Sequence, residues 1–287
     1  HYGMIAPTKI VREASEIGGK GAEKYLDELL IFREHAHHHC HKLVEPQSWS
    51  NLPEWAKISW SERVFTSTEK SPYLLEFGET GDTLWDSSQI GLFRHGVMHN
   101  NVRMTWGKAF ANWIKDPKDA MKTSLNFNNR YALDGRDPSS IAGVMWCFGL
   151  FDRSFSPYNP VMGNVRNRPT KIHQNRIDLE RYSNWTEKST LDKKLNIGIV
   201  GGGISGSFAA MLLENLGHDV TIWDKGRRAS GRLSSKEVTS DFSIHVGSKS
   251  FDSLPKWMER YVSEWVRLKL VRMNGNSLVP ILSLIHI

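Results

Sequence analysis

The sequence lacks several features that would place it in a specialised class of protein. It has no run of about 18 apolar residues, so no membrane span is predicted. Its two cysteines, Cys40 and Cys147, are too few for a disulfide framework and fit a reducing, intracellular compartment. They do not distinguish nucleus, plastid and cytoplasm. No internal repeat is visible at a period of about 20–50 residues.

Both ends also lack ordinary terminal signals. The chain begins at His1 rather than methionine, and no signal-peptide pattern follows. It stops in the apolar stretch PILSLIHI, without a polar tail. We therefore expect that it starts inside a larger protein. At the other end we expect a truncation or a few non-native residues.

The composition is that of an ordinary globular chain with many tryptophans. The 287 residues are 39% hydrophobic and 24% charged, which suggests about two domains. A net charge of +6 is compatible with nucleic acid but does not require it. The 11 tryptophans are an unusually large share, and a buried indole needs a partner for its N–H. They point to stacking or to electron transfer between aromatic rings.

The first 190 residues read as helical. Apolar spacing predicts helices over 19–43 and over 87–113, the second broken near Gly96. Asp116 and Pro117 predict another helix start, with the helix running to about residue 130. Proline, glycine and polar residues predict a loop over 46–57, a turn at DGRDPSS (134–140) and irregular structure over 154–170.

The pattern changes after a predicted linker over 183–194. A short apolar strand at 197–200 leads into Gly201, Gly203 and Gly206, which satisfy G-x-G-x-x-G. A helical pattern ending at Gly217 and a second strand, DVTIW (219–223), complete a βαβ unit. The glycines permit a tight turn, approach of a pyrophosphate and close helix–strand packing. The alternative is that they serve packing alone.

The residues that follow bear on which dinucleotide binds. Asp224 closes the second strand, where it would accept hydrogen bonds from an adenosine ribose. The stretch GRRASGRLSS (226–235) contains Ser230, Gly231 and Arg232, and resembles the FAD-supporting segment of flavin amine oxidases with one glycine missing. The stretch that follows resembles renalase-like members of that family, and the whole resemblance covers about 195–273. It implies FAD, with NAD(P) as the alternative, and places the substrate half beyond residue 287.

Three tryptophans organise the earlier part of the chain. Trp106 and Trp113 lie seven residues apart, so they share a helix face, and Trp85 precedes them. Around them the sequence resembles the helical FAD-binding domain of class II cyclobutane pyrimidine dimer photolyases, in order and spacing from residue 1 to about 182. The matching segments are HYGMIAP, YLDELLIFRE, DTLWDSSQ, MHNNVRMTW, NNRYALDGRDP and GVMWCFGLFDRSFSPYNPVMGNVRNRP.

The resemblance implies a fold, a cofactor and a substrate. It implies a mainly α FAD-binding domain over 1–182, followed by an incomplete α/β Rossmann-like domain over 195–287. The first would bind FAD and UV-damaged DNA, and the second a further dinucleotide. Flipping the dimer out of the duplex would bring it to the flavin.

The resemblance also assigns residues. The cofactor set is Asn100, Arg103, Asn128, Asp134 and Asp137, with Asn128 facing flavin N5 and the pair Arg103–Asp134 flanking the ring. Electron transfer would use Trp106, Trp85 and Trp113. The cavity for the dimer would be lined by Glu28, which could hold a proton, and by Met104 and Trp146.

Three departures from the family pattern leave the activity open. Phe32 replaces an arginine, Ser139-Ser140 replaces Asn-Gly, and Asn128 is followed by Asn129 rather than aspartate. The residues of the flavin site are retained, yet repair of pyrimidine dimers is one hypothesis among several. The others are a non-repairing, cryptochrome-like photoreceptor, an oxidoreductase acting through the C-terminal part, and an artefactual joining of two genes.

One further cluster has residue types that can bind a metal ion. His37 and His41 lie four residues apart on a predicted helix, with Cys40 beside them, which is a feasible ligand spacing. In the family this stretch is the turn after the helix of Glu28, and only Cys40 matches. No metal is therefore predicted, and the sequence makes no prediction of the oligomeric state.

Overall fold

The computed structural model describes residues 4–191 and 193–226, together with 231, 235–239, 242–245, 261, 271–274 and 277–280. It forms two compact units. We call His1–Glu69 with His95–Leu179 the helical unit, and Lys70–Arg94 with Glu180–Ile287 the mixed unit. The predicted fold class, mainly α followed by an incomplete Rossmann-like βαβ, is confirmed. The domain boundaries at 182 and 195 stay predictions.

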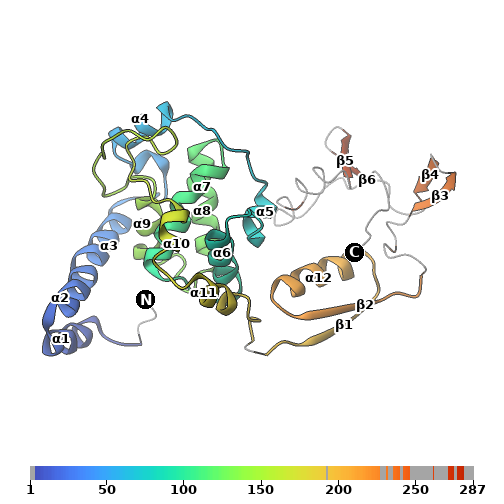
Figure 1. The fold of residues 1–287 in the computed structure, drawn as a ribbon, viewed down its shortest axis with the longest axis horizontal. Helices are drawn as coiled ribbons and strands as arrows, with labels where there is room; N and C mark the ends of the chain where they lie inside the picture. The colour runs from blue at the N-terminus through green and yellow to red at the C-terminus, as the bar shows by residue number, and fades with distance from the viewer. Residues whose placement is uncertain are drawn as a thin grey trace. The chain divides into compact units, whose positions relative to one another are not determined.

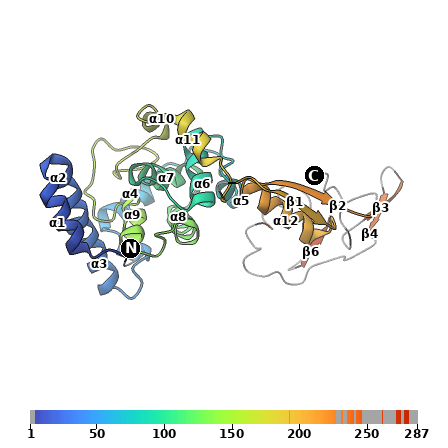
Figure 2. The ribbon, with the colours of Figure 1, turned by 90° about the horizontal axis from the view of Figure 1, so that it is seen from below.

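The helical unit begins with three consecutive helical segments. Helices α1 (Pro7–Ile17) and α2 (Gly19–Asp27) lie side by side (Figure 2). A π-helical turn, Glu28–Phe32, joins α2 to α3 (Arg33–Lys42). The helix predicted over 19–43 is therefore confirmed, with one wider turn inside it. Such turns often occur at functional sites, and this one carries both Glu28 and Phe32.

The loop predicted over 46–57 is only partly correct. A 3₁₀ turn, Trp49–Asn51, is followed by helix α4, which already starts at Glu54 and runs to Glu62. Pro53 precedes the first turn, and Ala56 and Trp60 of α4 are buried. Tertiary burial thus extends a helix into a stretch whose composition favoured a loop.

Capping residues fix the three central helices. Helix α7 (Asn100–Trp113) follows the break at Gly96, whose φ is +70°. Asp116 accepts from the N–H of Lys118 (2.7 Å) and starts α8 (Pro117–Tyr131), as predicted. The stretch 134–140 is a turn only in its first half, because Asp137 caps α9 (Pro138–Trp146) through the N–H of Ser139 (2.8 Å).

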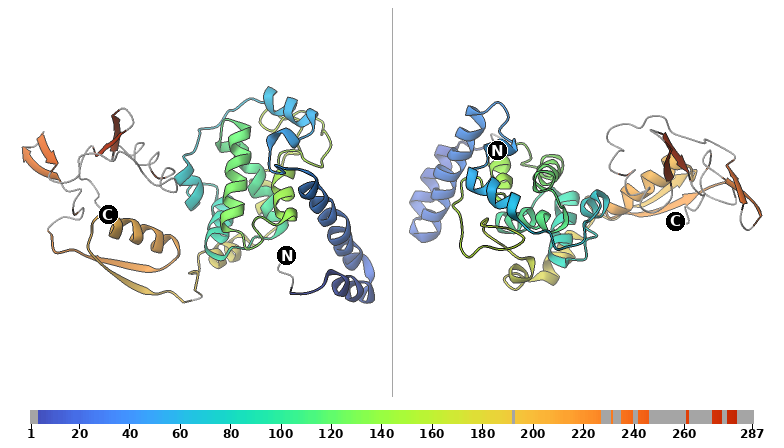
Figure 3. Two further views of the ribbon diagram at one scale, coloured as in Figure 1. Left: turned by 180° about the vertical axis from the view of Figure 1, so that it is seen from behind. Right: turned by 90° about the horizontal axis from the view of Figure 1, so that it is seen from above.

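The core of the helical unit lies among these helices. Helices α7, α8 and α9 pack against one another, and α7 and α8 lie side by side in Figure 3. The ring centroids of Trp106 and Phe110 lie 4.8 Å apart, and those of Phe110 and Phe127 lie 5.8 Å apart. After α9 the chain is irregular, as predicted, until the short helix α10 (Thr170–Gln174).

The mixed unit joins helices to a small parallel sheet. It contains α5 (Pro72–Phe77), α6 (Thr83–His95), most of α11 (Leu179–Thr186), and the βαβ unit of β1 (Asn196–Val200), α12 (Ile204–Asn215) and β2 (Asp219–Trp223). Strands β1 and β2 are parallel, with Asn196 opposite Asp219, and α12 lies along them (Figure 1). Two antiparallel hairpins follow, β3 (Ser235–Thr239) with β4 (Phe242–His245) and β5 (Val271–Asn274) with β6 (Ser277–Pro280).

Helix α12 is attached to α6 at its C-terminal end. Arg94 of α6 donates to the carbonyl oxygen of Asn215 (2.7 Å) and to that of Glu187. A cation placed there complements the partial negative charge of a helix end. Gly217, with φ of +90°, lets the turn approach closely, since a Cβ there would lie 2.8 Å from Cα of Ser189.

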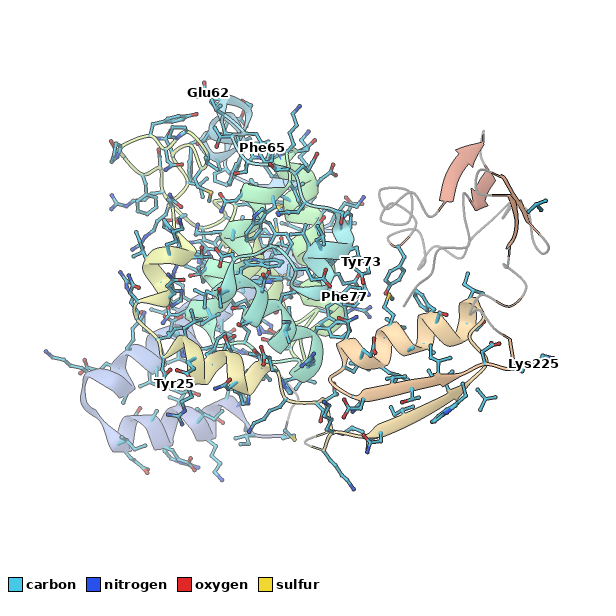
Figure 4. All side chains as sticks on the ribbon, turned by 45° about the vertical axis from the view of Figure 1, so that its right-hand side comes forward. Tyr25, Glu62, Phe65, Tyr73, Phe77 and Lys225 are labelled. Carbon is cyan, nitrogen blue, oxygen red and sulfur yellow. The ribbon has the colours of Figure 1, made fainter. Side chains whose placement is uncertain are left out.

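A group of aromatic rings makes a second attachment, which we call the aromatic joint. Its centre is Tyr261, which is 1% exposed. The ring centroid of Tyr261 lies 4.9 Å from that of Phe208 on α12 and 6.3 Å from that of Phe77 on α5. Tyr73 and Phe77 lie 4.8 Å apart on α5, where Figure 4 labels both. Phe77 also meets Phe93 of α6 at 5.5 Å. Helices α5, α6 and α12 therefore share one apolar core.

Candidate functional site

A charged pair stands at the centre of the predicted cofactor site in the helical unit. Arg103 of α7 donates from Nη1 to Oδ2 of Asp134 at 2.8 Å, and their side chains are 14% and 23% exposed. Asp134 lies in the turn after α8. In this turn the N–H of Leu133 donates a hydrogen bond to the carbonyl oxygen of Gly96 (2.8 Å). A pair this well covered fixes geometry more than it adds stability.

Ser140 links this pair to Asn128. Its Oγ lies 3.1 Å from Nη1 of Arg103 and 2.9 Å from Nδ2 of Asn128. Asn128 and Ser140 are 1% and 4% exposed. We call Arg103, Asn128, Asp134 and Ser140 the Ser140 network. The structure thus brings three of the predicted cofactor residues together, and it adds Ser140, which in the sequence is only a departure from the family pattern.

Two members of the Ser140 network, and Ser139 beside it, have spare hydrogen-bonding capacity. Among the described residues, buried Nε of Arg103, Oδ1 of Asp134 and Oγ of Ser139 have no hydrogen-bond partner. Buried polar atoms without partners are costly, so each calls for a ligand group or water. One donor, one acceptor and a hydroxyl suit the polar edge of a flavin ring. The residues present therefore fit FAD.

The other two predicted cofactor residues lie at the margin of the network. Asn100 is the exposed first residue of α7. Asp137 caps α9, one turn before Ser140. Neither belongs to the Ser140 network, and their contact with a cofactor stays a prediction.

Two of the three residues predicted to line the substrate cavity, Met104 of α7 and Trp146 of α9, lie on helices that pack against each other. The thiol of Cys147 lies 3.6 Å from the carbonyl oxygen of Met104, and Trp146 precedes Cys147 in the chain. The ring centroid of Trp146 lies 5.3 Å from that of Phe32 and 6.0 Å from that of Phe151. At position 32, where relatives commonly have arginine, this chain therefore places an aromatic ring beside Trp146.

Glu28 has a different environment from that expected of a proton holder. Its carboxylate pairs with Lys24 at 2.8 Å, and its side chain is 49% exposed. The pKa of Lys24 is raised, chiefly by its hydrogen bond to Glu28. Lys24 also lies 5.2 Å above the ring of Phe32. The structure therefore places Glu28 in a surface ion pair on the same π-helical turn as Phe32.

The predicted electron-transfer tryptophans are covered to different degrees. Trp106 is 1% exposed in the core of the helical unit. Trp113, two turns further along α7, is half-buried. The helix ends there because Arg63 donates to the carbonyl oxygens of Ala111 and Ile114, each at 2.8 Å. Trp85 is fully buried on α6 of the mixed unit.

A group of arginines was missed by sequence reasoning. Arg153 and Arg166 lie over the ring of Phe155, at 5.2 and 5.6 Å. The pKa of Arg168 is lowered by burial first, and then by the nearby charges of Arg166 and Arg176. Like charges held this close suit a polyanion. The signal available in the sequence was the arginine spacing in NVRNRP, in a stretch read only as irregular.

The glycine loop of the mixed unit has the expected form. Gly201 adopts φ of +104°, and its N–H donates to the carbonyl of Trp223 at 2.7 Å. Asp224 accepts from the N–H groups of Gly226 and Gly202, each at 2.6 Å, and these bonds lower the pKa of its carboxyl group. Its contact with a ribose stays a prediction. Arg232 lies outside the described residues.

Two alanine substitutions separate folding from binding in this loop. A Cβ at Gly206 would collide with the carbonyl oxygen of Gly201, whereas a Cβ at Gly203 meets nothing within 4 Å. We expect Gly206→Ala to destabilise the mixed unit by about 1–3 kcal/mol, as overpacking does. Gly203→Ala should fold normally and bind FAD or NADH more weakly. Thermal unfolding and dinucleotide titration measure both, and equal unfolding temperatures for the two variants would contradict the assignment.

The histidine-rich helix end shows no metal cluster. Within the described part of the chain, no three His, Cys, Asp or Glu residues are grouped closely enough to hold a metal ion. His39 instead lies 3.0 Å from the carbonyl of Pro46. Over the same described residues, no helix has the length and apolar character needed to cross a membrane.

Comparison with known proteins gives two separate similarities. Residues 199–265 match the family described as NAD(P)-binding Rossmann-like domain. The chain is 34% identical to the deoxyribodipyrimidine photo-lyase of Methanothermobacter thermautotrophicus over 184 residues, which are 63% of this chain and 41% of that protein. It is 30% identical to the enzyme of Oryza sativa (66% of this chain, 38% of the relative) and 33% identical to that of Arabidopsis thaliana (58% and 34%).

These relatives are longer than the chain, which spans about two fifths of the first two. The photolyase similarity was predicted from the ordered segments, and the dinucleotide-binding similarity from the glycine motif. Both are confirmed as similarities. The chain is thus similar to deoxyribodipyrimidine photolyases over nearly two thirds of its length and matches an NAD(P)-binding Rossmann-like domain over residues 199–265.

Proposed function

We propose that the protein is a photolyase-like flavoenzyme that acts inside the cell and splits cyclobutane pyrimidine dimers in UV-damaged DNA. The observation that carries the proposal is the Ser140 network, in which buried polar atoms of Arg103 and Asp134 have no partner among the described residues. The similarity to proteins named deoxyribodipyrimidine photo-lyase supports it. FAD, when bound in its reduced and light-excited form, would supply the electron that opens the cyclobutane ring.

The residues of the chain would bind and orient both partners. Arg103 and Asp134 would hold the ring edge of the flavin, with Asn128 directed at N5. Met104 and Trp146 would contact the flipped-out dimer, Trp146 by stacking. Arg153, Arg166 and Arg168 would bind phosphates of the DNA backbone. Trp106, Trp113 and Trp85 would carry electrons that return the flavin to its reduced form.

The test is repair of dimer-containing DNA under blue light by the FAD-loaded chain, with a dark sample alongside. Loss of dimers only in the light is the expected result. Trp146→Ala should weaken binding of damaged DNA, whereas Trp185→Ala, a change of the same kind at a tryptophan of the mixed unit, should not. If bound FAD is photoreduced and no dimers are lost, a cryptochrome-like photoreceptor is the better description.

A second activity is favoured by a separate observation. The glycine loop, with Asp224 held by two backbone N–H groups, has the form of a dinucleotide site. We infer that the mixed unit binds a second dinucleotide, FAD in preference to NAD(P), as part of an oxidoreductase. Two flavins per chain, together with oxidation of an amine or of NAD(P)H in the dark, are the expected results. One flavin per chain and no such oxidation would contradict it.

A further inference from the structure

The C-terminal end of helix α9, where Trp146 stands, is held by side chains of two other helices. The carbonyl groups at a helix end need partners from outside the helix. The carbonyl of Cys147 accepts from Nζ of Lys108 on α7 (3.3 Å), and that of Phe148 accepts from the indole N–H of Trp60 on α4 (2.8 Å). The backbone that directly follows Trp146 is therefore fixed at two successive residues.

Lys108 is an unusual group for a place in the core. It is 4% exposed on α7, and burial lowers the pKa of its ammonium group. Among the described residues it forms no ion pair, and the carbonyl of Cys147 is its hydrogen-bond partner. Burying a charge without a carboxylate beside it is unfavourable, so Lys108 adds little to the stability of the fold. Its contact with the end of α9 instead serves the geometry of the site.

The contact between α7 and Cys147 is close on either side of this bond. A Cβ at Gly107 would lie 2.7 Å from Sγ of Cys147, so glycine leaves the room that the sulfur occupies. The same sulfur lies 3.6 Å from the carbonyl oxygens of Met104 on α7 and Gly143 on α9. It thus touches both helices, and the distance between α7 and residue 147 is fixed.

The ring of Trp146 follows the position of this helix end. Its aromatic neighbours, Phe32 and Phe151, are half-buried and come from the π-helical turn and from the turn after α9. Because a side chain keeps its rotamer relative to its own backbone, a displacement of the helix end would move the ring with it.

We propose that Lys108 is a positioning residue that holds the C-terminal end of α9 against α7 and so orients Trp146 for stacking on the flipped-out dimer. The inference rests on the proposed function, in which Trp146 stacks on the dimer. Stacking depends on the offset between two rings, so a small displacement of the helix end weakens it. Contacts with the DNA backbone do not depend on that offset. Lys108 therefore acts on the preference for damaged over undamaged DNA.

The test is binding of two oligonucleotides of one sequence, with and without a cyclobutane dimer, to the FAD-loaded chain in the dark. Lys108→Met keeps most of the side chain and removes its donor. The ratio of the two dissociation constants, undamaged over damaged, should fall about fivefold, which is near the lower limit for one base stacked on an aromatic ring. Phosphate contacts are common to both oligonucleotides, so they cancel in the ratio.

Arg63→Met provides the matched control. Arg63 is likewise a partly buried cation that donates to carbonyl oxygens at a helix end, those of Ala111 and Ile114 at the end of α7 (each 2.8 Å). Its replacement should leave the ratio unchanged. An equal fall in Arg63→Met would show that losing any such cation disturbs the unit, and the specific role of Lys108 would be lost.

A double variant shows whether Lys108 acts through Trp146. Trp146→Ala should itself lower the ratio, and adding Lys108→Met to it should lower the ratio no further, because the ring to be positioned is absent. A further fivefold fall in the double variant, or none in Lys108→Met alone, would overturn the inference.

A second pair of variants tests the same contact without changing the lysine. Gly107→Ala places a Cβ against Sγ of Cys147 and should lower the ratio as Lys108→Met does. Adding Cys147→Ala removes the sulfur and should restore the ratio. If Lys108→Met does not fold, this pair decides, and a ratio unaffected by Gly107→Ala would contradict the proposal.

The outcomes separate this inference from the proposed function, because binding is measured without light. A preference for damaged DNA that falls as expected, with no loss of dimers under blue light, would remove the proposed function and leave the role of Lys108 standing. Normal repair with an unchanged ratio in Lys108→Met would remove only the role of Lys108. A chain without any preference for damaged DNA would overturn both.

Discussion

Exchanging Asp134 for asparagine is expected to lower the free energy of unfolding by about 3 kcal/mol and to remove most of the bound FAD. The exchange leaves Arg103 charged, 14% exposed and without its carboxylate. The cost should fall at the lower end of the range for buried pairs, since Asp134 keeps 23% exposure. Urea unfolding of the FAD-free chain and the flavin content of the purified protein measure the two effects.

Two further variants test the physical reason. Glu54→Gln breaks the ion pair between Glu54 and Lys57, in which the carboxylate side chain of Glu54 is 74% exposed. It should lower the free energy of unfolding by less than about 1 kcal/mol. Replacing Arg103 and Asp134 together by methionine and leucine should restore much of the stability, because no buried charge is left unpaired. It should not restore FAD binding. Wild-type stability and flavin content in Asp134→Asn would show that the pair holds neither the fold nor the cofactor.

Replacing Trp106 with phenylalanine is expected to abolish photoreduction of the flavin while FAD remains bound. A phenyl ring is far harder to oxidise than an indole, so the step nearest the flavin would be interrupted. The smaller side chain also leaves a cavity in a core where Trp106 is 1% exposed, at a cost of about 1–2 kcal/mol. Absorption changes of the flavin under blue light, with an external electron donor present, measure the rate.

Trp60→Phe provides the matched control. Trp60 is 2% exposed in the same unit and donates its indole N–H to the carbonyl of Phe148 (2.8 Å). Its replacement should destabilise the unit by a similar amount and leave photoreduction intact. Photoreduction at the wild-type rate in Trp106→Phe, or an equal loss in Trp60→Phe, would count against an electron-transfer role for Trp106.

Local patterns predicted much of this fold. Asp116 with Pro117 marked the start of α8, and the glycine motif between two apolar stretches marked the βαβ unit. Each of these signals lies within a few residues of the structure that it produces. The start of helix α4 falls inside the stretch predicted as a loop, because Ala56 and Trp60 are buried by distant parts of the unit and not by their own neighbours in the chain.

The sequence predicted which residues form the candidate site better than it predicted the hydrogen bonds between them. The resemblance named Arg103, Asn128 and Asp134, yet Ser140 entered only as a departure in a turn. A single hydroxyl within 3.2 Å of two other side chains is decided by the packing of α7, α8 and α9, which no local pattern contains. The surface pairing of Glu28 with Lys24 depends likewise on how the π-helical turn is directed.

The attachment of α12 to α5 and α6 bears on how the chain can be dissected. A fragment ending at residue 182, where the photolyase resemblance stops, would lose both carbonyl acceptors of Arg94, on Glu187 and Asn215. It would also lose Phe208 and Tyr261 from the aromatic joint, and so expose Phe77 to water. The helix that carries Trp85 therefore shares its packing with the segment that contains the glycine motif, and trimming experiments should keep residues 70–94 with residues 180–261.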